Sequence, residues 1–410
     1  MNAITLVYAI TIFYMLAGCA KDQHPSKTGS PQLMEITESE RDVIKRNKEF
    51  GISLLKQMAK KEQDNILISP ISMNMALCMM FNGAKGETKG QMTKALKKQG
   101  IRNHAINNTH KKLLETLPSI DSNVTNHIAN SIWYRHTFSL DQSFIDTTKH
   151  YYHSQLIGLD FTSPTAKKTI NHWVEQNTGG KITRIIEEID DQHVMFLINA
   201  TYFNGKWTNA FDPGKTSPGQ FELPDGSNAQ VPMMHYEKTN FYYHSTDSLE
   251  VAEIPYGNGS YRMTILLPKK GTVDNVIQNM RAQKWKSLVS EGDSAGRREL
   301  YLPKFELNSK KEMKEVLMDM GMGVAFDPQR ANFEGINQEA GQQLFIDNVK
   351  HKVHLKVDEE GTEAAAATSV GVGITSMPPV MRVDRPFVLA IREKETATLL
   401  FIGRITNPTT

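Results

Sequence analysis

The sequence has little of what metal-dependent, redox or nucleotide-using enzymes need. Its 410 residues include two cysteines, Cys19 and Cys78, and they contain neither an HExxH motif nor a Walker loop. Without such motifs we expect no metal site and no cofactor. The 47 Lys and Arg residues nearly balance the 45 Asp and Glu residues, so the formal net charge of +2 provides no global field for nucleic acid or acidic lipid.

Charged side chains are also missing from the first 18 residues, which are mostly apolar. The run is short and interrupted by threonines, so it predicts an export signal over 1–18 rather than a membrane-spanning helix. Leu16-Ala17-Gly18-Cys19 resembles a bacterial lipobox, in which the cysteine becomes the lipidated N-terminus. We therefore expect Cys19 to anchor an exported lipoprotein to the bacterial outer membrane or cell surface. An ordinary secretory signal and a secreted protein are the alternative.

No disulfide is expected within the chain, because a lipidated Cys19 cannot pair with Cys78. Residues 19–37 contain Pro, Ser and Gly and predict a flexible tether before a single domain over 38–410. Helical spacing of apolar residues over 41–60 predicts an amphipathic helix, and Ser72 is expected to cap a buried helix over 73–81. Short apolar runs after about residue 194 predict buried strands, which is typical of an α+β domain.

Two apparent matches to catalytic chemistry fail on geometry. The segment from Gly292 to Gly296, Gly-Asp-Ser-Ala-Gly, fits the pattern of a serine nucleophile, which needs a strand before it and a helix after it. Here a helix is predicted before it, over 276–288, and a strand after it, over 300–302, so we interpret the match as a surface turn. His351 and His354 lie three apart in a predicted strand, so they point to opposite faces and cannot share a metal. We expect that the protein is not an enzyme.

The segment 362–375 alternates in a strand-like way. Every second residue is small or apolar, as follows: Thr362, Ala364, Ala366, Thr368, Val370, Val372 and Ile374. Yet the segment is rich in alanine and glycine and runs into Pro378-Pro379, where a central strand cannot continue. It is therefore compatible both with an exposed loop and with a buried strand, and as a strand the twelve residues 362–373 would span about 40 Å. Taken alone, the stretch would equally suit an alanine-rich linker.

Motifs along the whole chain resemble the serpin family from about residue 41 to 408. They occur in the family's order at residues 65–72, 171–174, 178–182, 199–207, 231–234, 302–305, 319–322, 385–387 and 401–405. The resemblance implies an α+β fold with three β-sheets, eight or nine helices and an exposed reactive-centre loop. It also implies a metastable suicide inhibitor: a protease attacks the loop, and the cut loop inserts into the central sheet and distorts the covalently bound enzyme.

The family's functional positions carry over to named residues of this chain. The loop hinge consists of acidic and small residues: Glu359, Glu360, Gly361, Thr362, Glu363, Ala364, Ala365, Ala366 and Ala367. Counts forward from Gly361 and back from the 385–387 motif both place the reactive bond at Thr375-Ser376, with Ile374 and Met377 as alternative cleavage sites. The insertion gate, where the sheet must open, comprises Lys304 with Glu359 and a polar cluster: Asn65, Ser69, Ser72, Asn171 and His351. Lys304 and Glu359 could also be two exposed charges whose interaction contributes little to stability.

Thr375 offers no basic group to a trypsin-like pocket, so the expected targets are elastase-like or subtilisin-like serine proteases, and papain-like cysteine proteases come second. The expected partner is thus a protease held covalently by a monomeric inhibitor, with no nucleic acid and with membrane contact only through the lipid anchor. The rival reading is a non-inhibitory serpin that binds or carries another molecule, against which the small-residue hinge argues. The residues Lys94, Lys97, Lys98 and Arg102 could bind a polyanion, but they are more typical of a solvated helix face.

Overall fold

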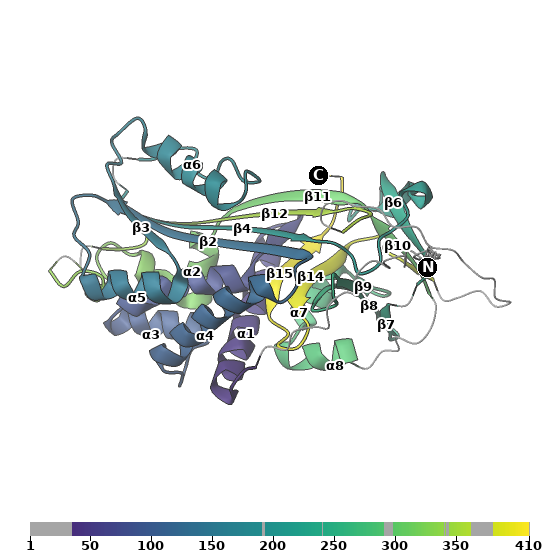
Figure 1. Cartoon of the computed structure of the whole chain (residues 1–410), viewed down its shortest axis with the longest axis horizontal. Coiled ribbons are helices and arrows are strands. Elements are labelled where there is room, and N and C mark those ends of the chain that lie inside the picture. Colours follow the sequence, from purple (N-terminus) through teal and green to yellow (C-terminus); the bar gives the residue numbers. More distant parts are fainter. Residues whose placement is uncertain are drawn as a thin grey trace, which may run out of the picture.

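In the part of the chain that it describes, the computed structural model contains three β-sheets and nine α-helices (Figure 1). The description covers residues 35–190, 193–239, 241–290, 298–339, 341, 344–361 and 380–409. The α+β class, the three sheets and the number of helices expected from the sequence are confirmed. No helix in these segments has the length and apolar character needed to cross a bilayer.

The helices form most of the first half of the fold. Their bounds are α1 Glu38–Lys61, α2 Pro70–Gly83, α3 Gly86–Ala95, α4 Asn103–Thr116, α5 Gln142–Tyr152, α6 Ala166–Asn177, α7 Val273–Asn279, α8 Trp285–Ser290 and α9 Lys314–Leu317. Helix α1 starts with a capping box, in which the Glu40 N–H donates to Thr37 Oγ1 and the Thr37 N–H donates to Glu40 Oε2. Its buried stripe, which includes Val43 and Leu54, confirms the amphipathic helix expected over 41–60.

Two expectations about helices are wrong. Helix α2 has Ser69 and not Ser72 at its N-cap, because Pro70 fits the first helical position, where its fixed φ is favourable and no N–H is needed. The single helix expected over 276–288 is broken after α7. Met280 has an extended backbone there and turns its side chain into the core, where it is 5% exposed.

The central sheet has five strands in the order β11, β12, β4, β2 and β3. The strands are β2 Val124–Arg135, β3 Gln155–Leu159, β4 Met195–Gly205, β11 Phe305–Glu312 and β12 Asn348–Val357. Strands β12 and β4 are parallel neighbours, and each has an antiparallel partner on its other side, β11 and β2. Figure 1 shows α6 on one face of this sheet and helices α1 to α5 below the other.

Two further sheets complete the fold. The six-stranded sheet has the order β1, β15, β14, β9, β8 and β7, and the four-stranded sheet has the order β13, β10, β6 and β5. Their strands are β1 Ile66–Ile68, β5 Ser217–Glu222, β6 Asn228–Thr239, β7 Tyr242–Ser245, β8 Leu249–Tyr256, β9 Tyr261–Pro268, β10 Arg298–Pro303, β13 Val380–Arg382, β14 Phe387–Glu393 and β15 Leu399–Ile405. The buried strands expected after residue 194 are therefore confirmed.

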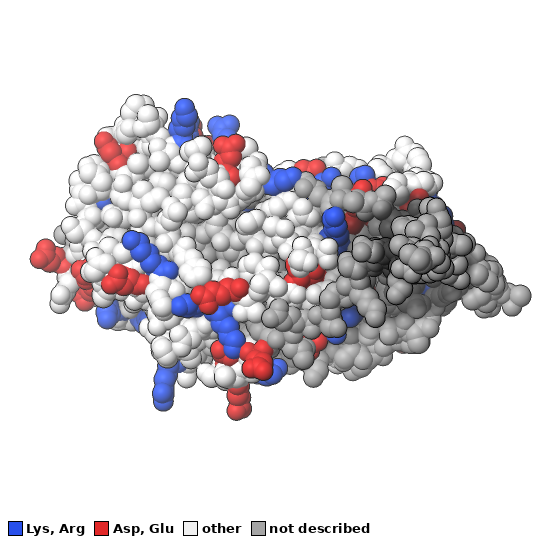
Figure 2. Space-filling model, viewed as in Figure 1, with Lys and Arg blue, Asp and Glu red and all other residues white. Residues whose placement is uncertain are grey.

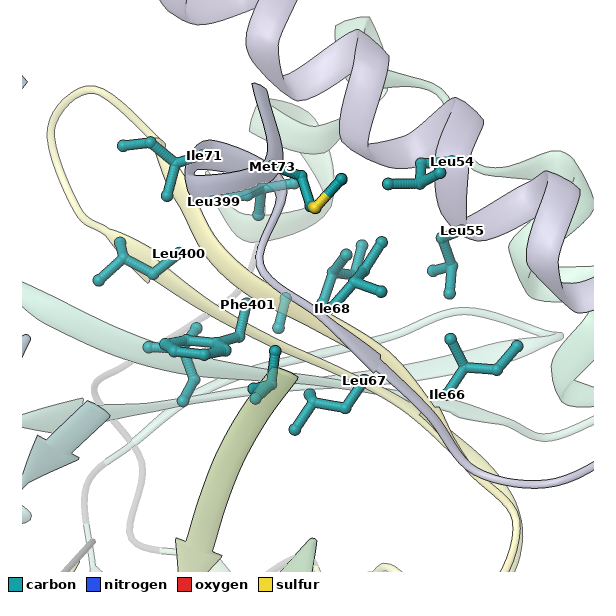
Figure 3. Close-up of a cluster of buried hydrophobic side chains, with 14 of the residues drawn as sticks. Leu54, Leu55, Ile66, Leu67, Ile68, Ile71, Met73, Leu399, Leu400 and Phe401 are labelled. Atoms are coloured by element: carbon teal, nitrogen blue, oxygen red, sulfur yellow. The ribbon is translucent and has the colours of Figure 1, made fainter. Parts of the chain in front are cut away.

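The core lies where α1, β1, α2 and β15 meet (Figure 3). Leu54 and Leu55 of α1 face the short strand β1, and Leu400 and Phe401 of β15 pack from the other side. All four side chains are completely buried, which removes apolar surface worth about 1.5–3 kcal/mol for each residue from water. This core fixes α2, whose first turn supports the central sheet.

Candidate functional site

The pairing of β12 with β4 forms a seam in the middle of the central sheet. Its register aligns His351 with Asn199 and ends at His354 and Tyr202. Because the two strands are parallel, a strand that folded back from the end of β12 would be antiparallel to both of them. Antiparallel pairing is slightly more stable per residue than the parallel pairing it would replace.

A tight turn after β12 already points the chain into this seam. The Asp358 N–H donates to the Gly361 carbonyl (3.0 Å), and the Gly361 N–H donates to the Asp358 carbonyl (3.3 Å). Gly361 also forms an antiparallel bridge with Lys206, the residue that follows β4. Gly361 therefore lies between the continuations of the two seam strands, where the first residue of an inserted strand would lie.

Only glycine suits position 361. Its φ is +135°, a conformation that residues with a side chain rarely adopt, and a Cβ atom there would lie 2.2 Å from the Gly205 carbonyl oxygen. The close approach of two backbones is what lets the chain begin to fill the seam.

The turn is anchored to the segment that follows β4. The Trp207 N–H donates to the Glu360 carbonyl (2.9 Å), and the Phe211 N–H donates to the Glu359 carbonyl (2.6 Å). The indole N–H of Trp207 donates to the Asp358 carbonyl (2.9 Å), and its ring stacks on Tyr256 with centroids 4.3 Å apart. The start of the hinge is thus held by backbone bonds and by a buried tryptophan.

The structure brings Lys304 and Glu359 together at the turn. Lys304 Nζ donates to Glu359 Oε2 (2.8 Å), and Thr216 Oγ1 donates to Oε1 (2.8 Å). Burial acts to raise the pKa of Glu359, but hydrogen bonds from Lys304, from its own backbone and from Thr216 outweigh it and hold this pKa below its usual value. The carboxylate is therefore charged at neutral pH, and its side chain is only 11% exposed.

A buried polar cluster closes the seam from the helical side. The Ser69 N–H donates to His351 Nε2 (2.9 Å), and His351 Nδ1–H donates to Asn199 Oδ1 (2.6 Å). The Asn199 amide donates in turn to Ser72 Oγ and to Asn130 Oδ1. Three expected gate residues, Ser69, Ser72 and His351, therefore meet here, and they link α2 to both seam strands.

His351 is neutral in this arrangement. Complete burial lowers its pKa from 6.5 to about 3. Its Nε2 atom accepts from the Ser69 N–H, so a proton on that nitrogen would face a donor instead of an acceptor. Acid would therefore break the bond between the seam and the start of α2.

Asn65 and Asn171 do not join the cluster, so the expectation that they line it is wrong. Asn65 Nδ2 donates to the Asn407 carbonyl (2.6 Å), and its Oδ1 accepts from the Thr406 and Asn407 N–H groups. Asn171 projects from α6 and binds the backbone of Ile185 and Ile186. The first therefore fixes the C-terminal segment, and the second fixes the segment after α6.

Several predicted positions lie outside the described residues. They are the hinge residues Thr362, Glu363, Ala364, Ala365, Ala366 and Ala367, the reactive bond Thr375-Ser376, the alternative sites Ile374 and Met377, and the lipidation site Cys19. The Gly292 to Gly296 match also lies outside them. The elements that flank it, α8 before and β10 after, confirm the order that argues against a nucleophile elbow. Within the described residues, no three His, Cys, Asp or Glu side chains are grouped to hold a metal.

Sequence reasoning missed the partners of the gate residues. Asn199 and Thr201 lie in β4 among apolar residues, and Thr201 Oγ1 donates to Ser72 Oγ (2.7 Å). The sequence signal that could have identified them is the placement of two polar residues at alternate positions of the otherwise apolar run that forms β4. Thr216, which binds Glu359, stands in a polar segment that offered none.

The fold removes one residue from the candidate basic patch of Lys94, Lys97, Lys98 and Arg102. Lys98 is 1% exposed, and its ammonium donates to Asn47 Oδ1. Burial lowers the pKa of Lys98 to about 8. Lys98 therefore does not lie on the solvated face expected for it. On the face drawn in Figure 2, positive and negative side chains of the described residues are interspersed.

Comparison with known proteins decides the family. The family model described as "Serpin (serine protease inhibitor)" matches residues 45–408. This chain belongs to the serpin family. An uncharacterized serpin-like protein of Methanosarcina acetivorans is 31% identical over 90% of this serpin and 87% of the relative. The crystal structure of a thermophilic serpin, tengpin, in its native state superposes with a TM-score of 0.83 at 31% identity, covering 93% of this chain and 97% of that one.

Serpins are generally protease inhibitors and not enzymes, but the relatives also include a protein named for binding corticosteroid. Corticosteroid-binding globulin of Pongo abelii is 30% identical over 92% of this chain and 93% of the relative. Family membership therefore establishes the fold, and the choice between inhibitor and carrier depends on the hinge and the seam.

Proposed function

We propose that this serpin is a suicide inhibitor that traps proteases by inserting its cleaved loop between β12 and β4. The observation that carries the proposal is the position of Gly361, which pairs antiparallel with Asp358 on the β12 side and with Lys206 on the β4 side. A strand that continued from Gly361 would lie in the seam. The twelve residues 362–373 would span about 40 Å, enough to follow all ten residues of β12.

The sequence of the hinge supports a role as a protease inhibitor over a role as a binding or carrier protein. A strand can enter a closed sheet only where its side chains pass between two existing strands, and four consecutive alanines, Ala364 to Ala367, offer the least obstruction. A carrier needs a binding surface, whereas trapping requires a loop that can become a strand.

A denaturing gel tests the proposal. The serpin is incubated with pancreatic elastase, and a covalent complex that survives SDS is expected, together with a C-terminal fragment that begins at Ser376. Thr362→Arg is expected to turn the inhibitor into a substrate, because a charge would be buried as insertion starts, whereas the matched variant Thr362→Val should still trap. Cleavage that leaves elastase fully active, with no complex, would refute inhibition and favour the carrier.

The targets follow from the reactive bond. With Thr375 before the cut, we infer elastase-like or subtilisin-like serine proteases, followed by papain-like cysteine proteases. Thr375→Arg should redirect trapping toward a trypsin-like protease, whose pocket carries an aspartate, while Ile374→Arg should not. The reverse result would move the reactive bond by one residue.

The sequence of residues 1–37 supports export of the protein and its anchoring to a membrane. We infer a monomer tethered through a lipid on Cys19, with the folded domain beginning near Glu38. Metabolic labelling with a fatty acid in a bacterial host should mark the wild type but not Cys19→Ser. Equal release of both forms into the medium without label would favour an ordinary secretory signal.

A further inference from the structure

A row of side chains crosses four strands of the central sheet at one level. The register pairs Asn308 of β11 with His354 of β12, His354 with Tyr202 of β4, and Tyr202 with His127 of β2. The Tyr202 ring stacks on the His354 ring with centroids 5.8 Å apart, and on the His127 ring with centroids 6.4 Å apart. His354 Nδ1–H donates to Asn308 Oδ1 (2.8 Å).

This row lies on the face of the sheet that α6 covers. Ala200, two residues before Tyr202 on β4, packs with Ile170 and Val174 of α6, and alternate residues of a strand share a face. Lys181, in the segment after α6, places its ammonium 5.8 Å from the centre of the Tyr202 ring. Tyr202 and His354 are 6% and 7% exposed, so their contact is nearly dry.

The seam is therefore closed on both faces by a pair of side chains. On the face toward α2, His351 bonds to Asn199, and three residues further along, on the opposite face, His354 stacks on Tyr202. These two histidines cannot share a metal, but each of them contacts β4 from β12. Two earlier pairs of the β12–β4 register lie on the same α6 face: Lys350 is opposite Ile198, and Lys352 is opposite Ala200. Neither pair has two rings that could stack.

A strand that entered the seam would have to separate Tyr202 from His354. Neighbouring strands lie about 4.8 Å apart, so an inserted strand would move β12 and β4 to about twice that separation and end the contact between the two rings. The bond between His351 and Asn199 would end in the same step. The two contacts oppose opening independently, because they lie on different faces.

We propose that the stack of His354 on Tyr202 is an outer latch that limits the opening of the seam. The inference rests on the proposed loop insertion for its functional meaning, and on the row of side chains for the latch itself. An aromatic pair of this kind is expected to slow opening about two- to tenfold. The latch therefore makes insertion slower in the intact serpin. Cleavage frees the loop, and the pairing of the loop with β12 and β4 supplies the driving force that breaks the latch.

Two matched variants test the latch. His354→Val removes the ring and introduces a β-branched residue suited to the strand, while His354→Phe keeps a ring to stack on Tyr202. Asn308 is exposed, so it can bind water when either variant removes its partner. Native-state hydrogen exchange of amides in β4 and β12 reports seam opening, and amides in β14 and β15 report any global change. The rate of elastase trapping is measured in parallel.

The latch predicts that His354→Val speeds exchange at the seam about two- to tenfold relative to β14 and β15 and that it speeds trapping, while His354→Phe resembles the wild type. If amides in β4 and β12 of His354→Val exchange at the wild-type rate, the latch is overturned, whether or not the protein traps elastase. If the wild type traps no protease while His354→Val still opens the seam faster, the latch stands and the proposed inhibition fails.

Discussion

Lys304 Nζ donates to Glu359 Oε2 at 2.8 Å, beside the turn that leads from β12 into the loop. Lys304 is 40% exposed along its side chain and Glu359 is 11% exposed, so water screens only one end of the pair. The Glu359 carboxylate also accepts a hydrogen bond from the Thr216 hydroxyl, and its backbone carbonyl accepts one from the Phe211 N–H. One acidic residue thus joins the link between β10 and β11, the residue before β5 and the chain after β4 to the start of the hinge.

Neutralising this residue should loosen the hinge. Glu359→Gln loses the ionic bond to Lys304, and we expect the free energy of unfolding to fall by about 1 kcal/mol, measured by urea titration with Trp fluorescence. The pair of Lys215 with Glu237, whose carboxylate side chain is 50% exposed, offers a matched control. Glu237→Gln should change stability little, and an equal loss in both variants would contradict a special role for Glu359.

Adding a methyl group at position 361 should be costly. Gly361→Ala combines a φ of +135° with a Cβ that would meet the Gly205 carbonyl, and we expect a loss of about 1–3 kcal/mol in thermal unfolding. Gly226 has a φ of +82° with no atom within 4 Å of the same Cβ position, so Gly226→Ala isolates the conformational cost. If both variants lose the same stability, the close approach at the hinge does not exist.

Acid should weaken the gate through His351. Its pKa is about 3 in the folded state against an ordinary 6.5, so the unfolded chain binds more protons between these values. Stability is therefore fully present above about pH 6.5 and falls as the pH is lowered toward 3, by up to about 1.4 kcal/mol per pH unit. His351→Gln cannot be protonated, so its stability should depend less on pH in this window. Parallel curves for the two proteins would be inconsistent with a neutral, buried His351.

The buried Lys98 should cost stability at neutral pH. Its pKa falls from 10.5 to about 8 on folding, so the unfolded chain binds the proton more tightly between these values. We expect Lys98→Met to be about 1–3 kcal/mol more stable at pH 7, after the loss of the bond to Asn47 is included. The advantage should shrink as the pH rises from 8 toward 10.5. A variant less stable than the wild type at pH 7 would show that the ammonium is needed there.

Much of the fold could be predicted from local patterns. The amphipathic spacing of α1 and the apolar runs of β4, β9 and β15 depend on which side of an element is buried, and a single segment carries that information. The loop was recognisable because its two-residue period conflicts with its glycines and prolines. Such a conflict within one segment is visible without any tertiary contact.

The partners across the sheet could not be predicted, because they depend on how distant segments align. Asn65 lies in the same motif as Ser69 and Ser72, yet its side chain reaches the C-terminal segment, while the Ser69 N–H and the Ser72 hydroxyl bond to the seam strands. His354 was visible as a strand residue, but its stack on Tyr202 needs the register of β12 on β4. Lys98 looked like a surface residue because its neighbours in the sequence are charged. Its burial follows from the packing of α1 against the turn after α3.

The stability of the cut serpin tests loop insertion most directly. A single cut at Thr375-Ser376 leaves residues 362–373 joined to β12, and under the proposed insertion these residues pair with β12 and β4 along their length. The cleaved and rechromatographed protein should therefore unfold at a clearly higher temperature and urea concentration than the intact one. Exchange of amides at the seam should slow at the same time. A cleaved protein that unfolds at or below the midpoint of the intact protein, with unchanged exchange in β4 and β12, would contradict insertion between these strands.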